Sequence, residues 1–129
     1  MAPVPDLQTP ILLAQSERPV CTATADRLIA NGFFVIEVAS TDDALSYLES
    51  RSDIRLMITE IDMPGCLSGL DLARFVMRRW PNIGIIVLGW PVQPTPSLPQ
   101  SVTFLPKPCS PLSVAVQVRA KLAISSRPA

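Results

Sequence analysis

Two charged residues, Glu60 and Lys107, stand near the ends of apolar segments of the chain. Glu60 follows the run 56–59, and Lys107 comes shortly after the run 102–105. Continuous apolar runs of this length are typical of strands covered on both faces, and parallel strands end at one edge of their sheet, where such folds bind ligands. The sequence therefore predicts a carboxylate and an ammonium group at a ligand-binding edge.

Of the other residues expected at this edge, Gln15, Ser16 and Gly89 are uncharged and Glu17 is acidic. Gln15 and Ser16 end the first apolar run, Glu17 lies just beyond them, and Gly89 ends the fourth run. The chain has no His, which excludes Ser-His and Cys-His nucleophiles, a zinc site that needs imidazole, and a phosphohistidine relay within this chain.

Apolar runs alternate with helical patterns along the chain. This alternation predicts a doubly wound, flavodoxin-like sheet of five parallel strands in the order 2-1-3-4-5, with helices on both faces. The strands are expected at 10–14, 33–38, 56–60, 83–88 and 102–105. Helices are expected at 18–30, as a short helix that follows a cap at 40 or 41, at about 70–80, and from 111 to about 124.

Capping residues indicate where the helices begin or end, and apolar spacing indicates which of their residues are buried. Asn31-Gly32 ends the first helix, Ser40 or Thr41 begins the second, and Ser110 caps the last helix with Pro111 in its first turn. The expected buried residues are Val20, Thr24, Leu28 and Ile29 in the first helix, Ala44, Leu45 and Leu48 in the second, Leu70, Leu72, Ala73, Val76 and Met77 in the third, and Leu112, Val116 and Leu122 in the last.

The stretch 90–100 contains four prolines, which predicts a loop or a single turn where a helix would otherwise stand between the fourth and fifth strands. The helix at this place is therefore expected to be short or missing. Trp90, Val92 and Leu98 then either remain partly exposed as a sticky surface, or Trp90 caps the core.

These features together resemble a response-regulator receiver domain, over nearly the whole chain. Three features carry the resemblance: the Met63-Pro64 turn after Glu60, the block 104–108 (Phe-Leu-Pro-Lys-Pro), and the entry into the fourth strand after Trp80-Pro81. In that family an Asp on the third strand accepts a phosphoryl group from a histidine kinase, and an acidic pair on the first strand holds Mg²⁺. A Thr or Ser on the fourth strand contacts the phosphoryl group, and a Lys before a cis-proline neutralises it.

The resemblance places Lys107 at the family's Lys and makes Pro108 the candidate cis-proline. Glu60 stands in place of the acceptor Asp, Gln15 and Ser16 in place of the acidic pair, and Gly89 in place of the hydroxyl residue. Magnesium requires oxygen ligands that include at least one or two carboxylates. The Glu60 side chain places its carboxylate one methylene farther out than the Asp of the family pattern, into the space that the phosphoryl group would occupy. We therefore expect a degenerate receiver without Mg²⁺ or another cofactor, without enzymatic activity, and with phosphotransfer lost or very weak.

Several alternatives remain open at this stage. Glu60 paired with Lys107 either imitates the phosphorylated state or closes a vestigial pocket. Residual phosphorylation at Glu60 or at Asp62 is a further alternative, with Asp62 otherwise a surface loop residue. Binding of another small ligand in the crevice is a last one, although no Gly-rich phosphate loop supports it. The expected partners are a histidine kinase, another regulator, or a second copy in a homodimer.

Length and composition limit the number of domains and the kinds of partner that the chain can have. The 129 residues suit one domain at 10–125, with a flexible leader at 1–9 and a tail at 126–129. Eleven basic and 11 acidic residues give zero net charge, which argues against nucleic acid, and Arg78-Arg79 is expected to be a solvated helix end. No apolar run approaches the roughly 20 residues of a membrane span, so a soluble cytoplasmic protein is expected.

The cysteines are odd in number and lack a CxxC pair, which indicates reduced thiols. Cys21 is expected to pack within a helix. Cys66 and Cys109 lie near the rim and are reactive only where positive surroundings lower the thiol pKa, with Cys109, near Lys107, the better candidate.

Overall fold

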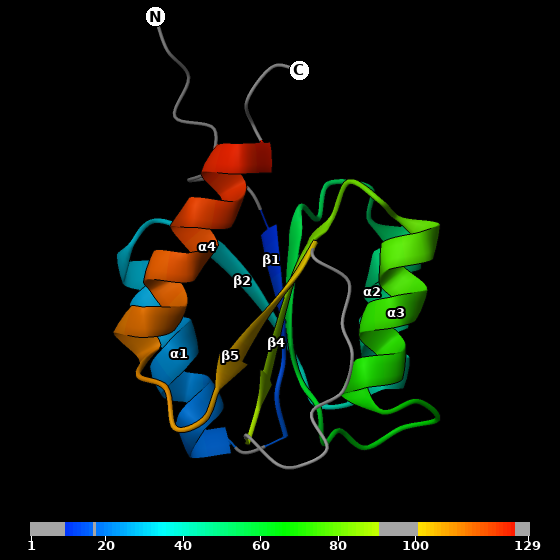
Figure 1. The fold of residues 1–129 in the computed structure, drawn as a ribbon, viewed down its shortest axis with the longest axis horizontal. Helices are drawn as coiled ribbons and strands as arrows, with labels where there is room; N and C mark the ends of the chain where they lie inside the picture. Colours follow the sequence, from blue (N-terminus) through cyan, green and yellow to red (C-terminus); the bar gives the residue numbers. More distant parts are fainter. Residues whose placement is uncertain (1–9, 17, 91–100, 126–129) are drawn as a thin grey trace, which may run out of the picture.

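The computed structural model describes residues 10–16, 18–90 and 101–125 and shows one parallel sheet between two layers of helices (Figure 1). The strand order is β2-β1-β3-β4-β5, as the sequence predicted. The strands are β1 (Pro10–Ala14), β2 (Phe34–Val38), β3 (Leu56–Glu60), β4 (Gly84–Gly89) and β5 (Val102–Pro106). The helices are α1 (Arg18–Ala30), α2 (Thr41–Ser50), α3 (Gly69–Arg79) and α4 (Pro111–Ser125).

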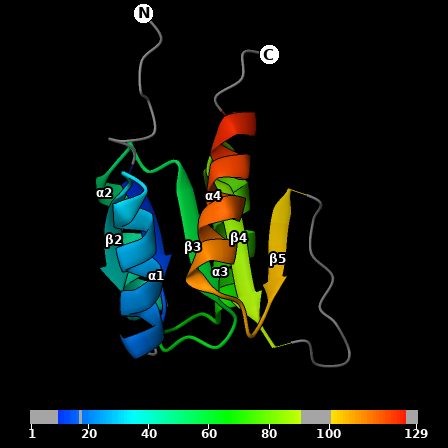
Figure 2. The ribbon, with the colours of Figure 1, turned by 90° about the vertical axis from the view of Figure 1, so that its left-hand side faces the viewer.

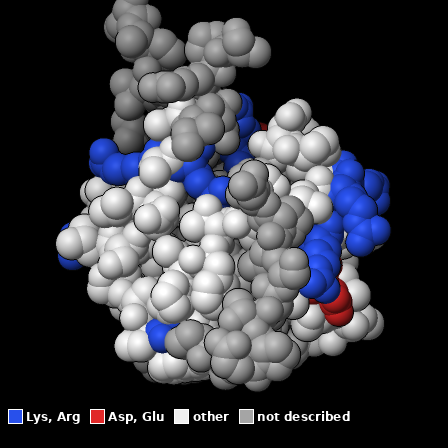
Figure 3. Space-filling model, in the orientation of Figure 1, with Lys and Arg blue, Asp and Glu red and all other residues white. Residues whose placement is uncertain are grey.

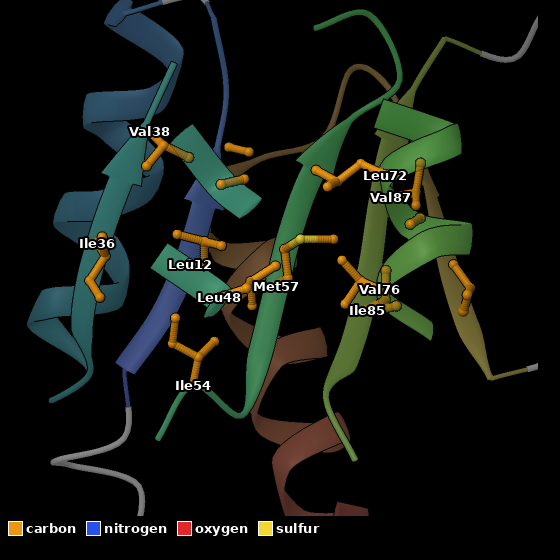
Figure 4. Close-up of a cluster of buried hydrophobic side chains, with 14 residues drawn as sticks. Leu12, Ile36, Val38, Leu48, Ile54, Met57, Leu72, Val76, Ile85 and Val87 are labelled. Carbon is orange, nitrogen blue, oxygen red and sulfur yellow. The ribbon is translucent and has the colours of Figure 1, made fainter. Parts of the chain in front are cut away.

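The sheet has a hydrophobic core on each face. Helices α1 and α4 cover one face and α2 and α3 the other, and the turned view shows α1 and α4 side by side (Figures 1 and 2). Successive residues of β1 alternate between the two cores: Leu13 joins the α1/α4 side, and Leu12 joins the α2/α3 side drawn in Figure 4. Because both faces are covered, every residue of β1 and β3 is buried, which explains their continuous apolar runs.

Hydroxyl side chains begin three of the helices. Ser40 accepts a hydrogen bond from the Asp43 backbone N–H at 3.1 Å, so Ser40, and not Thr41, is the cap of α2. Ser68 caps α3 in the same way. Ser110 accepts from the Ser113 backbone N–H at 3.0 Å at the start of α4, as the sequence predicted.

The predicted buried face of α4 is wrong at two of its three positions. Leu112 and Val116 are each 55% exposed, whereas Leu122 is buried as expected. The helix instead buries a different face, which packs against α1 and consists of Val114, Ala115, Val118 and Leu122. Because polar and apolar side chains of α4 are not separated onto opposite faces, its spacing alone does not select the inward face.

Smaller corrections concern the other helices. Ile29 is 53% exposed on α1, while Thr24 and Leu28 are buried as predicted. In α2 and α3 the predicted positions divide into buried ones (Ala44, Leu48, Leu72, Ala73, Val76) and partly buried ones (Leu45, Leu70, Met77).

Other predictions concern residues outside the described ones. These are the leader 1–9, the tail 126–129, the expected shortened helix within 91–100 with Val92 and Leu98, and the side chains of Val20 and Cys21. Trp90, at the end of the described segment, is 54% exposed, which favours the exposed alternative over a cap on the core. Within the described ranges, no helix combines the length and the apolar character that crossing a membrane requires.

Candidate functional site

The edge of the sheet where the strands end contains a buried ion pair between Glu60 and Lys107. Glu60 is the last residue of β3, and Lys107 directly follows β5. The Lys107 Nζ donates a hydrogen bond to Glu60 Oε2, and the side chains are only 14% and 3% exposed, respectively. The two charged groups therefore meet as the sequence predicted, and each compensates the other away from water.

The second carboxylate oxygen of Glu60 also has a protein donor. The backbone N–H of Ser16, just past the end of β1, donates to Glu60 Oε1 at 3.2 Å. A carboxylate with both oxygens engaged is held in one orientation and stabilised in its charged form. No pattern in the sequence indicates this contact, because it depends on how closely the end of β1 approaches the end of β3.

Backbone contacts fix the positions of the two charged residues. The Lys107 N–H donates to the Gly89 carbonyl at 2.8 Å, and the Ile61 N–H donates to the Leu88 carbonyl at 2.9 Å. These bonds tie the segments after β3 and β5 to the end of β4. The Lys107–Pro108 peptide bond is cis, the geometry that the resemblance implied for Pro108.

Gly89, which the resemblance placed at the family's hydroxyl position, faces an occupied space. A Cβ atom added to Gly89 would lie 2.5 Å from Ile61 Cδ1 and 3.3 Å from the Phe104 ring atom Cε1. The Ile61 side chain therefore fills the space that a Thr or Ser side chain would need. Ile61 was missed by the sequence analysis, since its only sequence signal was an apolar residue directly after the acid.

The other predicted site residues differ in their placement. Gln15 follows β1 and is 4% exposed, and among the described residues its Oε1 is a buried atom without a hydrogen-bond partner. Asp62 lies exposed in the turn after β3. Glu17 is outside the described residues.

The described residues at this edge do not fit the Mg²⁺ ion that receiver domains use. Gln15 supplies an amide and Ser16 a hydroxyl, whereas Mg²⁺ is held through carboxylates and water in octahedral geometry. The buried carboxylate, on Glu60, already binds the Lys107 ammonium and the Ser16 N–H.

The two cysteines near this edge differ in exposure. Cys66 is exposed, and Cys109 is partly buried. Burial raises the pKa of the Cys109 thiol more than the nearby positive charge of Lys107 lowers it. The condition that the sequence analysis set for a reactive Cys109 is therefore not met.

Comparisons with known proteins agree with the fold, although no family model matches the chain. The response regulator protein FleR of Pseudomonas aeruginosa is 28% identical over 78 residues, which cover 60% of this chain but only 16% of FleR. A response regulator receiver protein from Sinorhizobium medicae superposes with a TM-score of 0.81 at 24% identity, covering 92% of this chain and 98% of that one. The receiver domain of the hybrid histidine kinase CckA gives 0.72 at 27% identity, covering 88% and 98%.

The fold is therefore that of response-regulator receiver domains, and the sequence similarity to FleR and CckA supports a receiver domain as well. This chain shares with such domains the five-stranded parallel sheet in the order β2-β1-β3-β4-β5.

Proposed function

We propose that the chain is a pseudo-receiver of a two-component signalling system, which acts through protein contacts and without phosphotransfer. The observation that carries this proposal is the closed arrangement at Glu60, whose two carboxylate oxygens are taken by Lys107 and by the Ser16 N–H. A phosphoryl acceptor needs a free carboxylate oxygen facing the donor. For Glu60 to attack a phosphoryl donor, its ion pair with Lys107 would first have to break.

The side-chain length at Glu60 adds to this argument. A Glu extends one methylene farther than the Asp of the receiver pattern, and a displacement of about 1 Å can cost about a hundredfold in rate. Gln15 and Ser16 offer no carboxylates to hold the cation that would offset the charge of the incoming phosphate. We accordingly propose that the protein is not an enzyme and uses no metal cofactor.

A constitutive mimic of the phosphorylated state is the second candidate function, and the Glu60–Lys107 pair itself favours it. In receiver domains a hydroxyl on the fourth strand responds to the phosphoryl charge. Gly89 has no hydroxyl, and Ile61 occupies the space that such a group would enter. The vestigial pair is therefore the better supported of the two.

The partners that this proposal implies are signalling proteins. They are a histidine kinase or another regulator, with a second copy of the chain as an alternative, in the cytoplasm and without nucleic acid. FleR is a response regulator, and the CckA domain belongs to a hybrid histidine kinase, so the relatives come from both sides of such a pathway.

The test is to offer the full chain Mg²⁺ together with acetyl phosphate or beryllofluoride and to record intact mass and backbone amide shifts. A rebuilt variant, Gln15→Glu/Ser16→Asp/Glu60→Asp, serves as the positive control. We expect the rebuilt variant to respond at residues around position 60 and Lys107, and the natural chain to show neither a phosphoryl adduct nor such shifts.

An adduct on the natural chain would overturn the proposal. Its loss in Asp62→Asn would then assign the acceptor to Asp62, and its loss in Glu60→Gln would assign it to Glu60. Either result would establish the residually phosphorylatable receiver instead.

A further inference from the structure

A polar cleft lies at the opposite edge of the sheet from Glu60. Two segments form it: 51–55, the connection from α2 to β3, and 79–83, which is the last residue of α3 with its connection to β4. Its volume is about 770 Å³, which is within the range of about 300–1,000 Å³ typical of small-molecule sites. Three guanidinium groups line it, from Arg51, Arg55 and Arg79, and the described lining residues include no carboxylate.

The walls of this cleft are held in place by backbone contacts. The Gly84 N–H donates to the Arg55 carbonyl at 2.9 Å and joins the two connections directly. The Ile83 N–H donates to the Trp80 carbonyl at 3.1 Å and closes the second connection into a turn. Ile54, 3% exposed, anchors the first connection in the core. The arginines therefore extend from a preformed frame.

Two of the three arginines already have partners. Arg51 donates to both carboxylate oxygens of Asp53, at 3.0 and 2.9 Å. Arg79 lies 3.5 Å from a carboxylate oxygen of Glu49, and its guanidinium stands 4.9 Å from the centre of the Trp80 ring. Within the part of the chain that the structure describes, Arg55 has no carboxylate within salt-bridge distance.

Helix ends explain the first two arginines but not the third. Arg51 caps the C-terminus of α2, and Arg79 lies in the last turn of α3, where positive charge complements the helix dipole. Arg55 lies beyond α2, in the connection to β3, and has no such role. Basic side chains also gather over the surface of α3 (Figure 3), so the cleft adjoins a positive region.

We propose that this cleft binds a phosphate-bearing small molecule, with the guanidinium of Arg55 as the main anchor. Guanidinium groups bind phosphate through paired hydrogen bonds, and Arg51 and Arg79 keep N–H groups beyond those that their carboxylates use. Trp80 lines the same cleft and offers an aromatic surface to a ligand that carries a ring. The proposal does not depend on how Glu60 is used, because the two sites lie at opposite edges of the sheet.

The experiment is a titration of the full chain with inorganic pyrophosphate and, separately, with ATP, at a constant ionic strength of about 0.15 M. Amide shifts locate the site, and Trp fluorescence follows it in a Trp90→Phe background, which leaves Trp80 as the remaining tryptophan of two. We expect saturable shifts in 51–55 and 79–83 with at least one of the two probes. If ATP binds with higher affinity than pyrophosphate, the difference indicates a contact between the adenine ring and Trp80. Equal affinities indicate that the cleft recognises the phosphate groups alone.

The matched control is Arg78→Gln, which removes the same charge from an exposed arginine outside the cleft lining. We expect Arg55→Gln to weaken binding about tenfold and Arg78→Gln less than twofold. Equal losses in the two variants would show unspecific attraction to a positive surface and overturn the proposal. Absence of saturable shifts with both probes, or shifts that map elsewhere, would also overturn it.

Discussion

The ion pair between Glu60 and Lys107 is not symmetrical. The Glu60 side chain is 3% exposed at the end of β3, while Lys107 is 14% exposed and carries its charge on a long flexible stem. A buried charge that loses its partner is costly, whereas a long side chain near the surface can turn its charge toward water. The consequence of breaking the pair therefore depends on which partner is removed.

Removing the lysine is expected to cost more than neutralising the acid. Lys107→Met should lower the free energy of unfolding by about 3 kcal/mol, because it strands a buried carboxylate, and Glu60→Gln by about 1 kcal/mol. Urea unfolding of both variants measures the difference. The double variant is the control and should be more stable than Lys107→Met alone. Equal and negligible losses would show a solvated pair.

The two cysteines of the described segments should differ in reactivity. The thiolate is the reactive form, and burial raises the pKa of Cys109 above the ordinary thiol value of 9.0, so Cys109 stays protonated to higher pH. We expect exposed Cys66 to be alkylated at least about tenfold faster at a pH of about 8, and the Cys109 rate to keep rising above pH 9. Iodoacetamide labelling with peptide mass spectrometry resolves the sites. Faster labelling of Cys109 at neutral pH would contradict this expectation.

At the scale of elements, a glycine determines how closely α3 approaches β3. A Cβ atom added to Gly69, the first residue of α3, would lie 1.5 Å from the Glu60 carbonyl oxygen. The Gly69 N–H also donates to the Ile61 carbonyl at 2.8 Å. Because the clash is with backbone, the strand end that carries Glu60 would have to move.

Substitution of this glycine should therefore be severe. We expect Gly69→Ala to lower the free energy of unfolding by about 3 kcal/mol or more. Gly84→Ala is the matched control and should change it by less than about 1 kcal/mol, because the nearest atoms to its added Cβ are 3.6 Å away. Thermal and urea unfolding compare the two. A well-tolerated Gly69→Ala would contradict this close approach.

The sequence predicted the strands better than the helix faces. Runs such as 56–59 have one interpretation, because a strand buried on both sides is apolar throughout. Helix α4 offered no polar face to mark the outside, and Leu112 and Val116 were wrongly expected inside. At the site, Glu60 and Lys107 were found because each stands just after an apolar run, while Ile61 and the Ser16 N–H depend on distances between segments that no local pattern encodes.

At the scale of the whole molecule, burial decreases from the centre of the sheet to its edges. Strands β1 and β3 are buried throughout, and β4 is buried after its first residue. Strand β5 is partly buried over most of its length, β2 has exposed residues, and each pairs with a single neighbour. The free energy of local opening should follow this gradient, because it depends on buried contacts and on hydrogen bonds that must break.

Backbone amide exchange should therefore rank the strands. We expect the hydrogen-bonded amides of β1, β3 and β4 to exchange only through global unfolding, with a free energy of about 5–15 kcal/mol, and those of β2 and β5 to exchange earlier through local opening. Exchange followed by NMR gives the ranking, and urea unfolding gives the global value for comparison. As a control, the amide exchange rates should rise in proportion to hydroxide concentration. This dependence holds where an opened segment closes faster than its amides exchange. Protection of β5 equal to that of β3 would contradict local opening, because it would require the edge and the centre of the sheet to open together.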